Sequence, residues 1–250
     1  MKTLTRFLIV IFACTGLALT TFAGPEPIRD YKDKVVAPVP PPCNWQGFYI
    51  GLHAGGEFGR SGVEDLDGYN VAGDRSRFDA TGVVLGGQAG YNFQWRWLVL
   101  GLESDLGYMD LDGKGVQPAS PDGDTIGHTE SDFYGTFRNR IGFAPNEHWL
   151  FYTTGGGIVV NYETSVRDTR NIRPAGPDRI DATNTDFNWG WVVGAGMEYK
   201  FNCHWSLKAE YLYYQLEYQN FHAVALSTDD FAWRGTTDGN IGRVGINYHF

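Results

Sequence analysis

Beyond its first 23 residues, the 250-residue chain lacks any long apolar run. No later stretch approaches the roughly 20 apolar residues that a helix needs to cross a bilayer, so a membrane-spanning helix is not expected there. The mean hydropathy of -0.30 decides nothing, because alternation along strands dilutes the apolar signal about two-fold. If the mature protein spans a membrane, it must do so with strands.

Basic residues and cysteines are also scarce. Residues 1–23 hold two of the 20 Lys and Arg and none of the 29 acids, so the remaining chain carries 18 minus 29, or -11. This balance disfavours nucleic acid as a partner. Cys43 and Cys203 remain after residue 23 and lie beside expected turns on one rim. The pair permits one disulfide in an exported protein and fits neither a zinc site nor a redox motif.

The first 23 residues have the pattern of an export signal. Two basic residues precede an apolar run over residues 7–19, and small residues follow up to Ala23. This predicts a signal peptide over residues 1–23. A lipoprotein site at Cys14 is the alternative, disfavoured because apolar residues continue to Leu19. Six of the 11 prolines then fall within residues 24–44, which predicts an extended periplasmic linker.

Alternating segments fill the rest of the chain, residues 45–250. In the last eight residues, Val244, Ile246, Tyr248 and Phe250 alternate with polar residues or glycine, the pattern of a strand with one apolar face. Similar strands are expected over residues 45–59, 78–93, 97–109, 131–143, 149–164, 187–201, 205–218 and 235–250. Short turns alternate with long loops over residues 60–77, 110–130, 165–186 and 219–234. We therefore expect an all-β fold, an eight-stranded antiparallel transmembrane up-and-down barrel with short periplasmic turns and long extracellular loops.

Charged residues in these segments mostly share the parity opposite to the large apolar residues. A charge that faced lipid near the midplane would cost up to about 2 to 4 kcal/mol, so the charged parity is assigned to the lumen. The expected strand over residues 149–164 has large apolar residues on both parities, so it does not indicate which of its faces points to the lumen. The assignment predicts a network of five acids and five bases that largely fills the interior: Glu57, Glu103, Asp105, Arg138, Arg140, Glu198, Lys200, Lys208, Glu210 and Arg243.

Aromatic residues gather at the strand ends. They are expected to form two girdles that anchor a barrel at the membrane interfaces. The short-turn group includes Trp45, Trp97, Trp149 and Phe250, and the long-loop group includes Tyr108, Tyr162 and Trp189. The alternative, a soluble barrel or sandwich with these aromatics in its core, is disfavoured by their parity relative to the charges.

The segments resemble the small eight-stranded outer-membrane beta-barrel family of alphaproteobacteria, the porin-like immunogenic proteins typified by those of Brucella and rhizobia. The resemblance covers Trp45 to Phe250. It rests on residues 45–51, 101–105, 140–144, 208–214 and 243–250. The final strand, with Tyr248 and Phe250, looks like the C-terminal signal that the outer-membrane assembly machinery recognises.

The resemblance implies a protein of the cell outer membrane that is exported through the periplasm, contributes to envelope integrity and exposes its loops. Expected partners are outer-membrane lipid, lipopolysaccharide and the assembly machinery, with host or environmental surfaces as further candidates. A structural and surface-interaction role without catalysis, cofactor or metal is the leading hypothesis, because eight strands leave an interior just wide enough for side chains to fill.

Three other functions are weighed against this role. One is a narrow porin. Another is a haem-binding surface receptor, whose ligands would include His128 and His222 in expected outer loops. An enzyme is the third, but His128, Ser131 and Asp132 lack a nucleophile motif. Counted over residues 60–77, 110–130, 163–186 and 217–238, the outer loops with their adjoining residues carry 18 acids against nine bases. This favours simple solvation over divalent-bridged contact with lipopolysaccharide or a basic host surface.

Overall fold

The computed structural model describes residues 43–118, 120, 125–168, 181–224 and 230–250. The expected signal peptide, the alternative lipoprotein site at Cys14 and residues 24–42 of the expected linker lie outside the described residues. No helix among the described residues is both long and apolar enough to cross a membrane.

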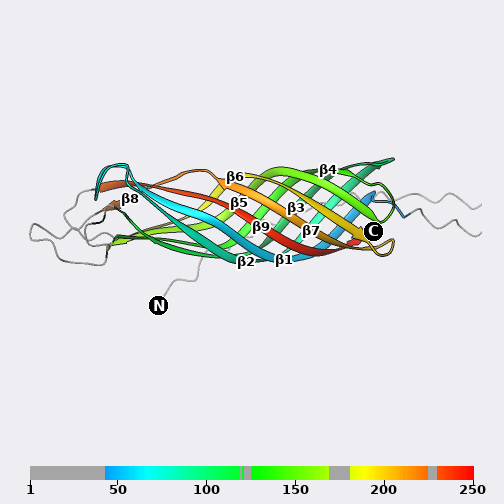
Figure 1. Cartoon of the computed structure of the whole chain (residues 1–250), viewed down its shortest axis with the longest axis horizontal. Helices are drawn as coiled ribbons and strands as arrows, with labels where there is room; N and C mark the ends of the chain where they lie inside the picture. The colour runs from blue at the N-terminus through cyan, green and yellow to red at the C-terminus, as the bar shows by residue number, and fades with distance from the viewer. Residues whose placement is uncertain (1–42, 119, 121–124, 169–180, 225–229) are drawn as a thin grey trace, which may run out of the picture. The chain divides into compact units, whose positions relative to one another are not determined.

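Antiparallel strands form a closed barrel (Figure 1). The strands are β1 Gly47–Asp65, β2 Arg75–Trp95, β3 Leu98–Val116, β4 Thr125–Phe143, β5 Trp149–Asp168, β6 Asp181–Lys200, β7 Trp205–Leu216, β8 Gln219–Val224 and β9 Asp230–His249. Strands β1 to β7 follow one another in sequence order, and β9 pairs with both β7 and β1, so eight strands close the ring. The short β8 pairs only with the first part of β9, beyond the end of β7. The expected eight-stranded up-and-down barrel is confirmed.

The strand ends at the short turns agree with the sequence analysis to within two residues. At the long-loop end the expected boundaries are wrong, because every strand except β7 extends three to seven residues further. Residues 219–224, expected in a loop, form β8. Its outward side chains Asn220 and His222 are polar, so no apolar outer face marks the strand although the backbone ladder continues. His128 and His222, expected in loops, consequently lie on β4 and β8.

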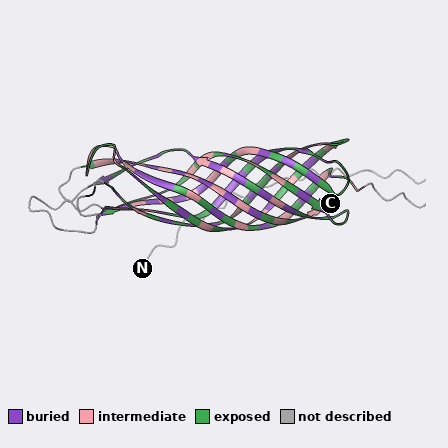
Figure 2. Ribbon diagram, viewed as in Figure 1, coloured by how far each residue is buried: buried purple, intermediate pink, exposed green. Residues whose placement is uncertain are grey.

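Burial alternates along the strands (Figure 2), as the alternation of residue types predicts. Leu106, Met197 and Val244 are about half exposed and face outward. Strand β5, whose sequence did not discriminate, places its even-numbered residues inside. A bulge at Asp132 shifts the register of β4 on both sides. Odd-numbered residues of β4 therefore face inward before the bulge, and even-numbered residues do so after it.

Exposed aromatic residues form a girdle near each end of the barrel, at 37–72% exposure. The girdles comprise Phe93, Trp95, Trp97, Phe143, Trp149, Phe201, Trp205 and Phe250 at the short-turn end, and Phe58, Tyr108, Phe133, Phe187, Trp189 and Tyr218 at the long-loop end. Two expected members are wrong, because Trp45 and Tyr162 are buried inside the barrel. Tyr162 has the inward parity of β5, and Trp45 precedes β1, where alternation gives no guide.

Candidate functional site

The barrel interior contains a connected charge network centred on Arg138. Nitrogen atoms of its guanidinium lie 2.5 Å from Glu103 and 2.7 Å from Asp105. A third contact, at 3.2 Å, reaches Glu210. The full network is Glu103, Asp105, Arg138, Arg140, Glu198, Lys208, Glu210 and Arg243, all of them buried. Its four acids and four bases give a formal charge of zero.

Strand register brings these charges together. Glu210 on β7 stands opposite Arg243 on β9, and their side chains form an ion pair. Lys208 stands opposite Glu198 on β6, but its ammonium nitrogen lies 2.8 Å from Glu103 across the lumen. The network therefore combines pairs between neighbouring strands with a contact that spans the interior.

Polar side chains donate further hydrogen bonds to the buried carboxylate of Glu198. Glu198 lies 3.0 Å from Arg140 and accepts hydrogen bonds from Ser206 at 2.5 Å and Asn247 at 2.7 Å. Buried charges need such additional hydrogen bonds to offset the loss of hydration. The interior thus holds the network in a defined arrangement.

The two other charged residues expected in the lumen are buried there but lie outside the network. The ammonium of Lys200 donates to the backbone oxygen of Asn44 at 2.5 Å and lies 4.6 Å from the ring centre of Trp45. Glu57 accepts a hydrogen bond from Tyr214 at 2.9 Å. Within the described part of the chain, its second carboxylate oxygen has no hydrogen-bond partner. Only eight of the ten expected residues are therefore brought together.

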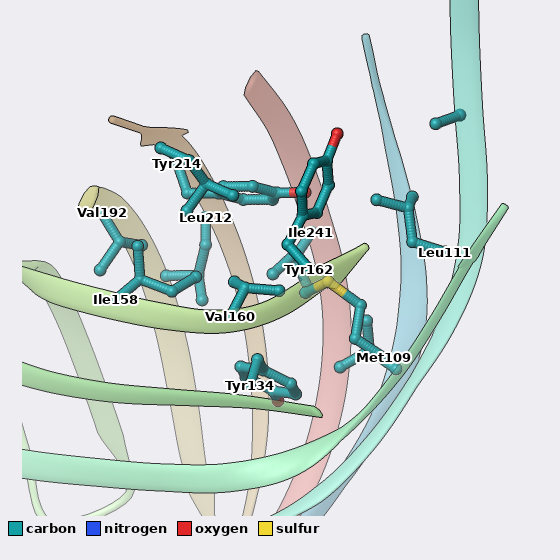
Figure 3. Packing of buried hydrophobic residues seen from close by; sticks show 13 residues of the cluster. Met109, Leu111, Tyr134, Ile158, Val160, Tyr162, Val192, Leu212, Tyr214 and Ile241 are labelled. Carbon is teal, nitrogen blue, oxygen red and sulfur yellow. The ribbon is translucent and has the colours of Figure 1, made fainter. Parts of the chain in front are cut away.

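An apolar cluster fills the lumen on the long-loop side of the charge network (Figure 3). It comprises Ala80, Val84, Met109, Leu111, Tyr134, Ile158, Val160, Tyr162, Val192, Leu212, Tyr214, Leu216 and Ile241. The expectation that charged side chains largely fill the lumen is wrong at this level. The signal is present in the sequence, because these apolar residues have the inward parity of their strands.

A second apolar cluster lies farther toward the long-loop end. It contains Val63, Tyr69, Phe78, Val166, Phe221, Ala223 and Trp233. Tyr69 comes from the β1–β2 connection, where Asp65 accepts hydrogen bonds at 2.8 Å from the backbone nitrogens of Gly68 and Asn70. The Tyr69 hydroxyl donates to Asp168 at the end of β5 at 2.7 Å. This connection therefore folds over the lumen and adds an aromatic ring to its contents.

The short-turn end is occupied by Trp45, which is fully buried. Its backbone nitrogen donates to Gln94 at 2.7 Å, and its ring belongs to an apolar cluster with Leu150 and Tyr152. Two residues before it, Cys43 forms a disulfide with Cys203 in the β6–β7 turn, with 5.0 Å between the Cα atoms. Sequence spacing alone left this pairing open.

Four inward tyrosines lie against glycines directly opposite on the neighbouring strand. The pairs are Tyr49 with Gly90, Tyr134 with Gly107, Tyr152 with Gly196, and Tyr214 with Gly239. A Cβ atom at Gly196 would lie 2.5 Å from Cζ of Tyr152. The missing side chain therefore makes room for the ring, an arrangement that also covers exposed backbone.

The residues weighed for catalysis or haem binding do not converge. Ser131 faces the lumen and donates to the backbone oxygen of Met109 at 3.4 Å, whereas Asp132 is exposed at the bulge. His128 is on β4 and His222 on β8, and these strands are not neighbours. At the C-terminus, Phe250 is 72% exposed and Tyr248 is half-buried.

Residues 36–250 match the outer membrane protein beta-barrel domain family. The chain belongs to this family. It is 32% identical over 215 residues to the 31 kDa outer-membrane immunogenic protein of Brucella melitensis, with 83% of this chain and 84% of the relative covered. It is 28% identical over 222 residues to the 22 kDa outer membrane protein of Rhizobium leguminosarum bv. viciae, with 86% and 82% covered. The family resemblance and the outer-membrane location inferred from the sequence are confirmed.

The fold is also similar to the crystal structure of the outer membrane protein OprG from Pseudomonas aeruginosa. The TM-score is 0.54 at 14% identity, and the match covers 83% of this chain and 98% of OprG. At this identity the likeness concerns the barrel fold alone. In this family member, the short-turn end is the periplasmic end and the long-loop end is extracellular.

Proposed function

We propose that this protein is a closed, non-catalytic barrel that supports the integrity of the outer-membrane envelope and does not pass solutes. The observation that carries this proposal is the succession of buried side chains along the lumen. The Trp45 cluster, the charge network and the two apolar clusters occupy four levels from the periplasmic to the extracellular end. An eight-stranded ring is narrow enough for its own side chains to fill.

Conductance measurements test whether the lumen is closed. They also distinguish this proposal from the alternative, a narrow porin. Wild-type protein inserted into planar bilayers is expected to give no stable conductance, and liposomes that contain it should not swell in sugar solutions. A general porin prepared in the same way is the positive control. Stable channels in the wild-type recordings would show that the plug is not closed.

The proposed envelope role also involves particular partners of the barrel. The outward apolar face and girdles support contact with outer-membrane lipid and lipopolysaccharide, and the terminal Tyr248 and Phe250 support recognition by the assembly machinery. The extracellular ends remain available to host or environmental surfaces.

Deletion of the gene tests this role. We expect increased uptake of an apolar dye and greater sensitivity to detergent, both restored by the wild-type gene. A gene that encodes the Phe250→Ser variant should restore dye exclusion and detergent resistance less fully, and less of the variant protein should be recovered from the outer membrane. Unchanged dye uptake after deletion would contradict the envelope role.

A further inference from the structure

Three metal-ligating side chains meet on the outward surface of the barrel, outside the filled lumen. Asp112 projects from β3, and His128 and Glu130 project from β4. Asp112 and Glu130 are opposite each other in the strand register. All three lie beyond the girdle residue Tyr108 toward the extracellular end, so they face the aqueous or headgroup zone rather than hydrocarbon.

The imidazole of His128 is directed at both carboxylates. Its Nε2 atom lies 3.2 Å from Glu130 Oε1 and 3.6 Å from Asp112 Oδ2. This nitrogen is shielded from solvent and has no hydrogen-bond partner in the described part of the chain. The three ligand atoms lie within 4.8 Å of one another.

The two separations from His128 Nε2 fit a small tetrahedral ion. Zinc binds imidazole nitrogen and carboxylate oxygen at about 2.0 to 2.2 Å, which places neighbouring ligand atoms about 3.3 to 3.6 Å apart. Imidazole favours zinc, copper or nickel over magnesium and calcium, which prefer oxygen ligands alone. One nitrogen and two carboxylate oxygens also leave a fourth position open.

Nearby charged residues include one that would repel a bound cation and one that would attract it. Lys114 stands opposite His128 and opposes a cation, whereas Glu163 on β5 stands opposite Glu130 and favours one. Glu163 accepts a hydrogen bond from Thr185 at 3.1 Å, which holds it in place. With Asp112 and Glu130 included, the local carboxylates outnumber the ammonium.

We propose that Asp112, His128 and Glu130 bind one divalent transition-metal ion of the zinc class at the extracellular end of the barrel, with the fourth position open to water. Cross-strand binding would tie β3 to β4 beyond the membrane, on the extracellular side of the register shift between Tyr108 and Leu111. The site is independent of the closed lumen and of its proposed function.

Calorimetric titration of the mature, untagged protein with zinc chloride tests the site. We expect one high-affinity event in the wild type. The His128→Ala and Glu130→Gln variants should each bind at least about tenfold more weakly, because loss of even an outer-shell partner costs about 10- to 100-fold in metal affinity. Asp112→Asn should have a similar effect.

The matched control is His222→Ala. His222 on β8 also lies near a carboxylate, with Nδ1 3.2 Å from Asp230, but no third ligand joins this pair among the described residues. Its loss should leave zinc binding unchanged. Heat-modifiable migration in gels verifies that every variant is folded.

Three outcomes of the zinc experiments would overturn the proposal. One is undiminished zinc affinity in folded His128→Ala. Another is equal loss in His222→Ala, which would indicate nonspecific binding to surface histidines. The last is magnesium competing with zinc at equal concentration, which would indicate an oxygen-only site. Hemin added in place of zinc should give no His128-dependent spectral change, and such a change would assign these residues to haem.

Discussion

At the residue scale, the charge network makes each buried charge depend on its partners. Arg243 forms ion pairs with Glu210 and Asp105 and is buried with them. Removing one charge from such a pair leaves the other without compensation in a medium that solvates it poorly, whereas removing both members leaves no net charge. Replacing one charged residue of a pair should therefore lower the unfolding free energy by more, per residue, than replacing both members of the pair.

The Arg243→Met variant should lose about 3 to 5 kcal/mol of unfolding free energy, as should Glu210→Met, because each leaves an unpaired buried charge. The double variant should lose clearly less than the sum of the two, since three acids and three bases remain. Urea titration of the refolded protein in detergent micelles measures all three. Additive losses would show that the two residues are not coupled. The neighbouring lipid-facing Val244→Ala variant is the control, and it should lose less than about 1 kcal/mol of unfolding free energy.

The tyrosine and glycine pairs give a steric prediction. Gly196→Ala should reduce the unfolding free energy by about 1 to 3 kcal/mol, because the new methyl group would overlap the ring of Tyr152 and force it to move. Gly242→Ala is the matched control, since a Cβ atom there meets nothing within 4 Å. Equal stability of the two variants in urea titration would refute the proposed fit between ring and glycine.

At the element scale, each strand has a lipid-facing segment and an aqueous extension. Within the first segment, apolar and polar residues alternate, so the parity of the terminal strand and of β3 could be predicted from the sequence. Beyond the girdle, the outward side chains of β3 include Asp112 and Lys114. Water then solvates that face, and no difference in hydrophobicity marks where the strand ends. This is why the boundaries toward the extracellular side could not be predicted.

Substituting lysine at two outward positions of β3 distinguishes the segments. Leu106→Lys should destabilise the barrel by about 2 to 4 kcal/mol, whereas Val116→Lys should cost about 0 to 1 kcal/mol because its ammonium reaches water. Both side chains are at least half exposed, so packing differences are small. Unfolding in lipid vesicles provides the measurement, and equal losses would place both positions in the same environment.

On the scale of the whole molecule, the closed ring and its inward charges could be predicted because alternation fixes them. The sequence did not specify which of those charges would meet. Glu57 and Lys200 share the inward parity but lie at other levels of the lumen, and levels depend on strand stagger, which alternation does not encode. The burial of Trp45 could not be predicted for a related reason, because the residues before β1 have no ladder to define their direction.

The disulfide should stabilise the barrel as a whole, because it closes a loop with a sequence separation of 160 residues. Cys43→Ser should lower the unfolding free energy by about 2 to 4 kcal/mol, the usual range for a native bridge. Cys203→Ser should match it, and the double variant should show no further loss, since one bond joins both thiols. Urea titration without reductant is the measurement. A wild-type curve indistinguishable from those of the variants would rule out a stabilising bridge.

The same covalent link determines how tension from the periplasm reaches the barrel. Cys43 precedes β1, and its partner lies in the turn that joins β6 to β7. Any pull on the chain ahead of Cys43 is therefore divided between two anchor points on the rim. The disulfide therefore opposes the first step in peeling β1 away from β2 and β9. The barrel resists such a pull as a unit.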